Sequence, residues 1–129
     1  MAQVKIYGLR EHLAPIKGTL SDVIHACTVE ALQLPVEKRF HRFFLLDPSD
    51  YLFPADRSER YTIIEISMFE GRSAETKKQL IRLLFAQLHK ELRIPPQDVE
   101  ITIFETPKQN WGIRGLPGDE LHLSYRVDV

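Results

Sequence analysis

The stretch that decides the fold is Tyr61–Ser73, which reads YTIIEISMFEGRS. It begins with branched and aromatic residues, which are typical of a β-strand. Gly71 ends that strand, and Ser73 is a suitable N-cap for a helix over Ala74 to about Leu92, where leucines recur at helical spacing. Val99–Thr106 then alternates apolar and polar side chains and predicts another strand. This part of the chain therefore predicts a β-α-β unit.

The first part of the chain repeats the same order. A short alternating strand around Val4–Gly8 is followed by apolar residues at helical spacing from Leu20 to Leu34. Thr19 or Ser21 is the expected N-cap of that helix. Phe40–Leu46, rich in aromatic and branched residues, predicts the strand that completes a first β-α-β unit.

Two such units in a chain of 129 residues fit one domain, since two separate cores need more chain. Strands joined by a crossover helix lie parallel, with a right-handed connection. We therefore predict an α/β fold of the α+β two-layer type over residues 1–129. Its tandem βαβ units form a four-stranded sheet with two helices on one face.

The predicted middle strands bear on the oligomeric state. In Phe40–Leu46 and Tyr61–Phe69, which we expect in the middle of the sheet, apolar side chains point to both faces. Two helices can cover only one face, so the bare face predicts an oligomer that packs through it. The alternative is that the tail, Pro107–Val129, folds back over that face. Leu121–Val127 within this tail resembles a short strand.

Composition excludes several classes of protein. Lys and Arg number 17 against 18 Asp and Glu, so the net charge is −1 and nucleic acid is not an expected partner. No apolar run approaches the roughly 18 residues of a membrane span, and the N-terminus lacks the apolar region of a signal peptide. The single Cys27 excludes an internal disulfide, and the five histidines lack metal-binding spacing. We expect a cytoplasmic protein with no membrane partner, metal or cofactor.

Three places carry residues suited to an anionic ligand. Lys38 and Arg39 lie in a basic cluster after the first predicted helix, for which the alternative is a solvated loop. Arg72 lies where a strand turns into a helix, and either a bound carboxylate or an acidic group within an oligomer would be its partner. Trp111, the only tryptophan, is expected either to wall a pocket or to anchor a subunit contact.

These motifs, in this order, resemble the tautomerase superfamily, and among its members the malonate semialdehyde decarboxylase-like and 4-oxalocrotonate tautomerase-like proteins. The resemblance covers most of the chain. It rests on Leu34-Pro35, Gly71-Arg72-Ser73-x-x-x-Lys77, Pro96-x-Asp98-Val99 and Asn110-Trp111-Gly112. It implies a homotrimer of double βαβ subunits, which agrees with the uncovered sheet face. It also implies isomerase or decarboxylase chemistry on a small anionic keto acid or unsaturated carboxylate.

The chain departs from the family pattern at several positions. Family chemistry depends on an N-terminal proline that acts as base or acid, and that position holds Ala2 once Met1 is removed. An acidic position of the decarboxylase-like members holds Lys38, and the paired family arginines correspond to Met68 and Glu70. A primary α-amine still titrates at roughly 7.7–8.0, so the amine of Ala2 keeps the capacity to transfer a proton.

We therefore expect a candidate site with two kinds of residue. The group expected to move the proton is either the amine of Ala2 or the carboxylate of Glu70. The residues expected to bind the substrate are Lys38, Arg39, Arg72 and Trp111.

Two other functions stay open at this point. One is a non-catalytic trimeric binding or structural protein that has lost the family's catalytic residues. The other is a ferredoxin-like nucleic-acid binder, because β-α-β-β-α-β also describes that fold. The second is disfavoured because Tyr61–Phe69 holds Glu65 and no basic residue.

Overall fold

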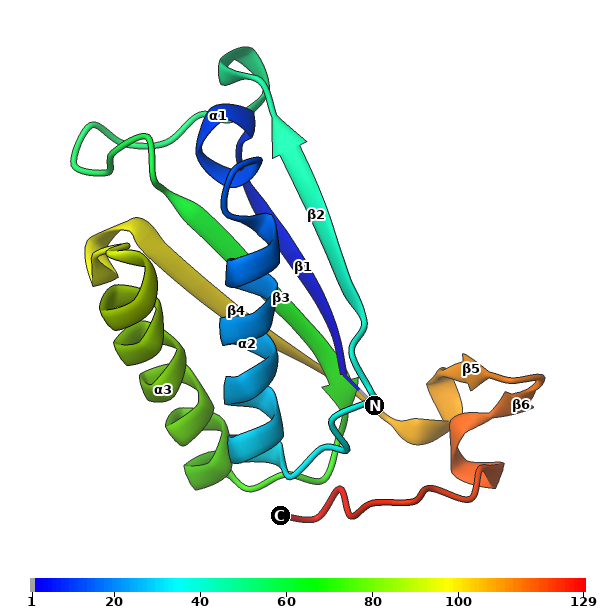
Figure 1. Cartoon of the computed structure of the whole chain (residues 1–129). Coiled ribbons are helices and arrows are strands. Elements are labelled where there is room, and N and C mark those ends of the chain that lie inside the picture. The colour runs from blue at the N-terminus through cyan, green and yellow to red at the C-terminus, as the bar shows by residue number, and fades with distance from the viewer. Residues whose placement is uncertain (1) are drawn as a thin grey trace.

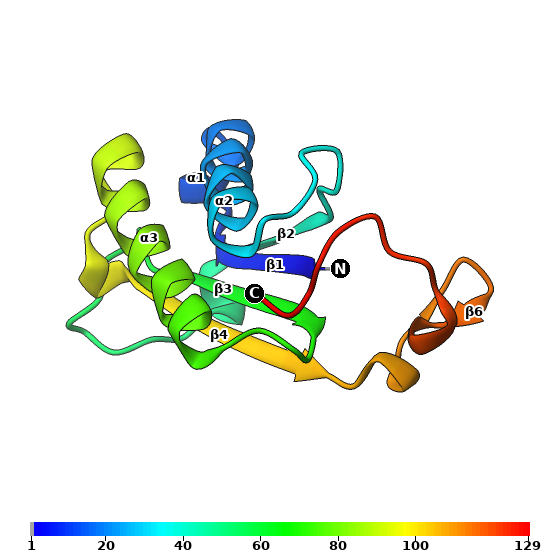
Figure 2. The ribbon, with the colours of Figure 1, turned by 90° about the horizontal axis from the view of Figure 1, so that it is seen from below.

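The computed structural model describes residues 2–129, in which two long helices lie against one side of a four-stranded sheet (Figures 1 and 2). The strands of the sheet are β1 (Ala2–Leu9), β2 (His41–Leu46), β3 (Thr62–Phe69) and β4 (Val99–Thr106). The helices are α1 (Arg10–Leu13), α2 (Lys17–Leu32) and α3 (Ala74–Leu92), and a small hairpin follows, β5 (Gly112–Ile113) with β6 (Leu116–Pro117).

The sheet has the strand order β2-β1-β3-β4. β1 pairs with β2 in parallel, β3 pairs with β4 in parallel, and β1 and β3 meet antiparallel in the centre. This confirms the predicted α+β two-layer fold built from tandem βαβ units. It also excludes the ferredoxin-like alternative, because there another strand separates the two parallel strands of each βαβ unit. The prediction that Phe40–Leu46 is a middle strand is wrong, because β2 forms an edge of the sheet.

Alternation along the strands places the core between sheet and helices. Every second residue of the two central strands is buried on the helix side, namely Ala2, Val4, Ile6, Gly8, Thr62, Ile64, Ile66 and Met68. Leu80, Leu84 and Leu88 of α3 are fully buried against them, as their helical spacing predicts. Each such side chain contributes about 1.5–3 kcal/mol to the free energy of folding by leaving water.

The two long helices begin differently. The Ser73 hydroxyl accepts a hydrogen bond from the Thr76 N–H (3.1 Å), so the predicted N-cap of α3 is confirmed. α2 begins earlier than predicted, at Lys17, and neither Thr19 nor Ser21 caps it. Its first turn is instead fixed by packing, because Leu20 is fully buried and its N–H donates to the Ile16 carbonyl.

The C-terminal tail packs against one end of the sheet and not over its open face. Val127 is 5% exposed and joins Phe69 in a small apolar cluster, and the Ser73 N–H donates to the Val129 carbonyl (3.0 Å). Gly71 adopts φ +136°, and a Cβ there would lie 3.0 Å from Val127. Residues 121–129 contain no strand, so the strand expected at Leu121–Val127 is wrong.

The open face of the sheet is more polar than the sequence suggested. Tyr7 stacks on Phe44 with ring centroids 4.7 Å apart, and its hydroxyl donates a hydrogen bond to Glu65 (2.7 Å). Glu65 of β3 lies opposite Lys5 of β1 in the antiparallel ladder. This bond to Glu65, with burial, raises the pKa of Tyr7. Phe44 and Phe104 remain 37% and 47% exposed there. Large apolar groups are thus exposed on this face, although charged residues separate them.

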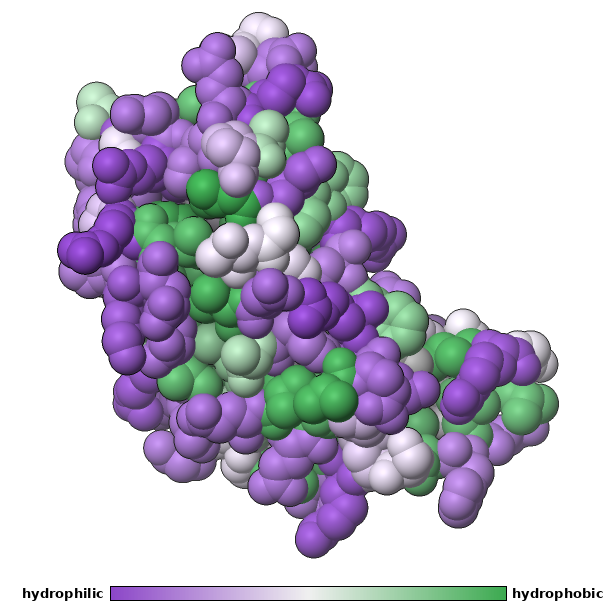
Figure 3. All heavy atoms as spheres, viewed as in Figure 1, coloured by the Kyte–Doolittle hydropathy of each residue, from purple (hydrophilic) through white to green (hydrophobic). Residues whose placement is uncertain are grey.

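The outer, helix side of the molecule is also hollowed. Figure 3 shows apolar side chains gathered between α2 and α3, bordered by hydrophilic ones. A groove of about 350 Å³ lies there and reaches the buried Cys27, whose thiol pKa burial raises to about 11. A thiol with that pKa is a poor nucleophile near neutral pH. Within residues 2–129, no helix has the length and apolar character that crossing a membrane requires.

Candidate active site

The candidate site is a pocket of about 250 Å³ at the start of β1, between the loop that leads into β2 and the β5–β6 hairpin. Ala2, at the first position of β1, directly precedes Gln3 in the wall of this pocket. The lining residues are Gln3, Lys38, Phe40, Trp111, Gly112, Ile113 and Arg114. Two residues predicted to bind the substrate, Lys38 and Trp111, therefore lie on the same pocket.

Backbone hydrogen bonds position the first wall of the pocket. After α2, the Lys38 N–H donates to the Pro35 carbonyl (3.0 Å), which forms a turn that brings Lys38 toward β1. The Val4 N–H donates to the Phe40 carbonyl (2.9 Å), so the entry to β2 is held against β1. Proline at the end of the helix and aromatic residues at the start of the strand thus bring Lys38 and Phe40 to the same place.

The opposite wall is held by the 3-10 turns on either side of the hairpin. The Trp111 N–H donates to the Lys108 carbonyl (3.2 Å), and the Trp111 carbonyl accepts from the Gly118 N–H (2.7 Å). The Trp111 ring meets Phe69 edge-on at 5.2 Å. Gly118 is required here, because a Cβ would lie 2.5 Å from the Lys108 carbonyl oxygen. Trp111 is therefore fixed by backbone and ring contacts and not by a long strand.

The pocket favours an anion with an apolar body. Lys38 and Arg114 are its charged lining residues, and no carboxylate lines it. Within the described part of the chain, neither of these two side chains makes an ion pair or hydrogen bond. Phe40, Trp111 and Ile113 supply apolar surface beside them. Arg114 was not among the residues predicted to bind the substrate, although it lies three residues after Trp111 in the same loop.

Arg39 and Glu70 lie outside the lining of this pocket. Arg39 donates to Asp22 of α2 (2.6 Å), so its guanidinium is engaged on the helix side. Glu70 is exposed in the turn after β3, and its backbone N–H donates to the Thr106 carbonyl (3.0 Å). The roles predicted for these two residues stay predictions.

Arg72 is buried behind the end of β3, with 4% of its surface exposed. Its Nη1 donates weakly to the Phe69 carbonyl (3.4 Å). Among residues 2–129, its Nε and Nη2 find no hydrogen-bond partner. Burial lowers the pKa of Arg72, and the nearby charge of Glu105 acts in the opposite direction. The tail packs beside the two flanking residues, because Val127 lies next to Gly71 and the Val129 carbonyl accepts a hydrogen bond from the Ser73 N–H.

Ala2 lies at the start of β1, opposite the last residues of β3. It is 5% exposed and pairs with Met68 in the antiparallel ladder. Met1, whose retention or removal decides which residue carries the α-amine, lies outside the described residues. The role predicted for the Ala2 amine therefore stays a prediction.

The protein has other cavities besides this pocket. A hollow of about 450 Å³ lies at the opposite end of the sheet, lined by residues of both charges, including Arg10, Asp47 and Arg60. In residues 2–129, no group of three His, Cys, Asp or Glu side chains lies close enough to hold a metal ion. The pocket at the start of β1 is distinguished by unpaired cations without opposing carboxylates.

The sequence pattern of the family described as "Tautomerase enzyme" matches residues 38–114, more than half of the chain. The chain therefore belongs to this tautomerase family, which confirms the resemblance.

Individual relatives agree with the family match. The 2-hydroxymuconate tautomerase of Comamonas testosteroni is 40% identical over 57 residues, which cover 44% of this chain and 90% of that protein. "Probable tautomerase YusQ" of Bacillus subtilis is 24% identical over 97 residues, covering 71% of this chain and 76% of YusQ.

Solved structures show the same fold. Malonate semialdehyde decarboxylase superposes with a TM-score of 0.80 at 21% identity, over 92% of this chain and 99% of that one. Native fused 4-OT gives a TM-score of 0.80 at 22% identity, over 92% and 98% of the two chains.

Proposed function

We propose that the protein binds a small keto acid or unsaturated carboxylate in the pocket at the start of β1 and moves a proton on it. The observation that supports this most is the pair of unpaired cations, Lys38 and Arg114, in a pocket without carboxylates. A carboxylate between them gains charge-assisted hydrogen bonds. Phe40 and Trp111 then cover the apolar body of the ligand. The family membership and the names of the relatives agree with this substrate class.

The proton carrier in this proposal is the amine of Ala2, with Glu70 as the second candidate. An α-amine with a pKa of roughly 7.7–8.0 is partly deprotonated near neutral pH and accepts or returns a proton there. Ala2 lies beside Gln3 of the pocket, whereas Glu70 is in the turn that follows the partner strand. Removal of Met1 is required for the first candidate, because otherwise the amine is displaced by one residue.

A second candidate function is binding without catalysis. It is favoured by Ala2 at the position where the family resemblance expects proline, and by Lys38 where it expects an acid. Such a protein would keep the cationic pocket and release the carboxylate unchanged. Mass spectrometry of native material decides whether Met1 is removed. If Met1 is retained, and a processed Ala2→Pro variant gains activity, the natural protein does not use the family's proton-transfer mechanism.

The homotrimer is also a proposal. Its support is the open face of the sheet, where Phe44 and Phe104 are exposed, and the likeness to fused 4-OT proteins described as trimers. Association through this face would bury both rings, and Lys5 and Glu65 would set its register. Sedimentation equilibrium tests it: three times the subunit mass is expected, and a monomer contradicts the proposal. A Phe104→Glu variant should shift the mass toward the monomer.

The enol-to-keto conversion of phenylpyruvate tests the proposed activity. We expect Lys38→Ala and Arg114→Ala each to raise KM by about tenfold, because each removes a charge-assisted contact. Arg82→Ala is the matched control, since Arg82 is an exposed α3 residue outside the pocket. Substitution of both Lys38 and Arg72 by alanine without loss of activity would remove these residues from the site.

A further inference from the structure

The segment that carries Lys38 into the candidate pocket contributes little to the core. It is a β-turn, in which the Lys38 N–H donates to the Pro35 carbonyl (3.0 Å). The two central residues of this turn, Val36 and Glu37, are exposed, and Val36 is exposed to 71%. Burial of their side chains therefore does not fix the orientation of the turn.

A buried histidine of α2 contacts the centre of this turn. His25 is 6% exposed, and its Nε2 lies 2.6 Å from the Val36 carbonyl oxygen. Because a carbonyl only accepts, the His25 Nε2 carries a proton and donates it. The Val36 carbonyl belongs to the peptide between the two central residues, and the orientation of that peptide distinguishes the common types of β-turn. The hydrogen bond thus selects one orientation of the turn and ties it to α2.

Another contact between α2 and this segment is more exposed. Arg39, the residue after Lys38, donates to Asp22 (2.6 Å) and to the Ser21 hydroxyl (3.4 Å). The Arg39 and Asp22 side chains are 41% and 69% exposed, and an ion pair between such exposed groups adds little to stability. The contact from His25 is the stronger restraint of the two, because it is short and shielded from water.

The second half of the chain closes an equivalent turn without a side-chain donor at its centre. After α3, the Asp98 N–H donates to the Pro95 carbonyl (2.9 Å). The carbonyl of Pro96, which takes the place of Val36 in this turn, accepts from the backbone N–H of Val99. The turn itself therefore does not require a histidine.

The two long helices differ at the corresponding position. Each is followed by a residue in the left-handed conformation, Gln33 after α2 and Arg93 after α3. Eight residues before these lie His25 in α2 and Phe85 in α3. An imidazole donor thus occupies this position in the half whose turn leads into the cationic pocket, and a phenyl ring occupies it in the other half.

We propose that His25 is a positioning residue, which holds the turn so that Lys38 faces the carboxylate of a ligand in the candidate pocket. The inference rests on the proposed carboxylate ligand and adds a residue that does not touch it. Without the hydrogen bond, the Val36–Glu37 peptide can reorient, and the Lys38 ammonium loses its fixed place beside the pocket. The alternative is a core histidine whose hydrogen bond stabilises the fold and leaves ligand binding unchanged.

Two substitutions of similar length separate the donor from the space that His25 fills. His25→Met has no N–H, whereas His25→Gln places an amide N–H near the position of Nε2. Positioning predicts weaker ligand binding in His25→Met and rescue in His25→Gln. His25→Leu replaces His25→Met if the latter does not fold.

The probe is phenylacetate, an aromatic carboxylate that does not tautomerise, titrated against the fluorescence of Trp111, the only tryptophan. We expect His25→Met to raise Kd by about three- to tenfold, the size of one lost hydrogen bond, and by no more than Lys38→Ala does. His25→Gln should bind close to wild type. In a Lys38→Ala background, His25→Met should have no further effect, because it acts through that lysine.

Three results would overturn the proposal. The first is an unchanged Kd in His25→Met, and the second is a His25→Gln variant as weak as His25→Met. The third is an equal loss of affinity with and without the Lys38 side chain, which would mean that His25 acts on the pocket by another route.

A second readout is independent of any ligand. Exchange of the Lys38 amide proton with solvent, followed by NMR, should be faster in His25→Met than in wild type and should return in His25→Gln. The Asp98 amide of the equivalent turn is the internal reference and should not change. If wild type does not bind phenylacetate, the proposed ligand class fails, while this exchange still decides whether His25 holds the turn. An unchanged rate at Lys38, or an equal acceleration at Asp98, contradicts that role.

Discussion

The two βαβ halves of the chain, β1-α2-β2 and β3-α3-β4, have the same backbone arrangement, but the two ends of the sheet that they form carry different side chains. Adding 60 to each residue number converts the parallel pair Val4–His41 of β1 and β2 into the pair Ile64–Ile101 of β3 and β4. The same shift relates the antiparallel pair Ala2–Met68 to the pair Thr62–Gly8, because Ala2 corresponds to Thr62 and Gly8 corresponds to Met68. The halves are therefore related by a pseudo-twofold axis between β1 and β3. Under this shift, Tyr51 corresponds to Trp111, and Asp98 corresponds to Lys38.

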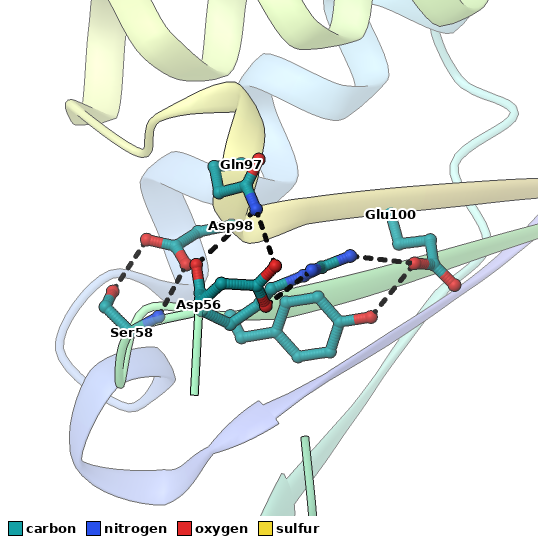
Figure 4. A network of polar contacts seen from close by, with 7 residues as sticks. Asp56, Ser58, Gln97, Asp98 and Glu100 are labelled. Atoms are coloured by element: carbon teal, nitrogen blue, oxygen red, sulfur yellow. Dashed lines mark hydrogen bonds and ion pairs between the residues drawn. The ribbon is translucent and has the colours of Figure 1, made fainter. Parts of the chain in front are cut away.

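At the end of the sheet opposite the candidate pocket, Tyr51 and Asp98 are buried and pack against neighbouring residues. Tyr51 is 8% exposed, donates to the Tyr61 carbonyl (3.1 Å) and lies 5.3 Å from the Phe53 ring. Figure 4 shows the polar part of this end, where Asp98 accepts hydrogen bonds from the N–H (2.7 Å) and the hydroxyl (2.6 Å) of Ser58. Equivalent places thus hold a filled aromatic cluster at one end and an open cationic pocket at the other.

The comparison predicts that substitution of the equivalent aromatic residues affects stability at one end and ligand binding at the other. Tyr51→Ala should lower the free energy of unfolding by about 3 kcal/mol, because it removes a buried ring from a packed cluster. Trp111→Ala should lower it by less than half as much, since Trp111 is only half-buried, but should abolish phenylacetate binding. Urea denaturation and ligand titration measure the two effects. Equal losses of stability would contradict the division between the ends.

The equivalent polar residues should differ in the same way. Asp98→Ala leaves the Ser58 N–H without its acceptor and should cost about 2 kcal/mol of unfolding free energy. Lys38→Ala, at the corresponding place, should change stability by no more than about 0.5 kcal/mol. Thermal unfolding monitored by circular dichroism compares them. Ser58→Ala is the control, because it removes only the hydroxyl contact and keeps the N–H bond.

We expect His41 to make the free energy of unfolding depend on pH, whereas its counterpart Ile101 has no group that titrates. Burial, with the neighbouring His25 and Arg39, lowers the pKa of His41 to about 4, whereas an unfolded histidine titrates near 6.5. Protonation of His41 is therefore less favourable in the folded state than in the unfolded state. The stability that depends on a neutral His41 is fully present above pH ~6.5 and is lost as the pH falls toward 4. His41→Ile should remove up to about 1.4 kcal/mol per pH unit of that slope. Urea unfolding at several pH values measures it; an unchanged slope contradicts the assignment.

The smallest effect is expected at the tail, which covers only one end. Val127 packs against Gly71 beside Arg72, whereas the hollow of about 450 Å³ at the opposite end is uncovered in residues 2–129. Val127→Ala should cost about 1 kcal/mol of stability, because it removes two methyl groups from the small cluster with Phe69. Urea denaturation measures this loss, and an unchanged free energy of unfolding would contradict the packing of the tail against this end.

The sequence was sufficient for the four strands of the sheet, the two long helices and the strand pairing within each half. Strand alternation in Tyr61–Phe69 and the leucine stripe of α3 are local signals, and a crossover helix leaves only the parallel arrangement. Local sequence patterns do not predict the order of the strands across the sheet, and the prediction that Phe40–Leu46 is a middle strand was therefore wrong. That order depends on β1 pairing with β3, a contact between distant segments.

The candidate site was predictable only in part, for a related reason. Lys38 and Trp111 were found through residue type and the family resemblance, and they meet on one pocket. Arg114 was missed because nothing local distinguishes its charge from that of other exposed arginines. Arg39 is paired with Asp22, a partner on another element that no spacing rule reveals. Which cations stay unpaired is decided by tertiary contacts.

The antiparallel ladder between β1 and β3 is the seam between the two halves. A chain that held only one such half could form this seam only with a second molecule, at a rate and extent set by their concentration. Here the linker between β2 and β3 fixes the effective concentration, so each half always meets its partner. Covalent linkage also frees the halves to diverge, because a substitution at one end is no longer copied to the other.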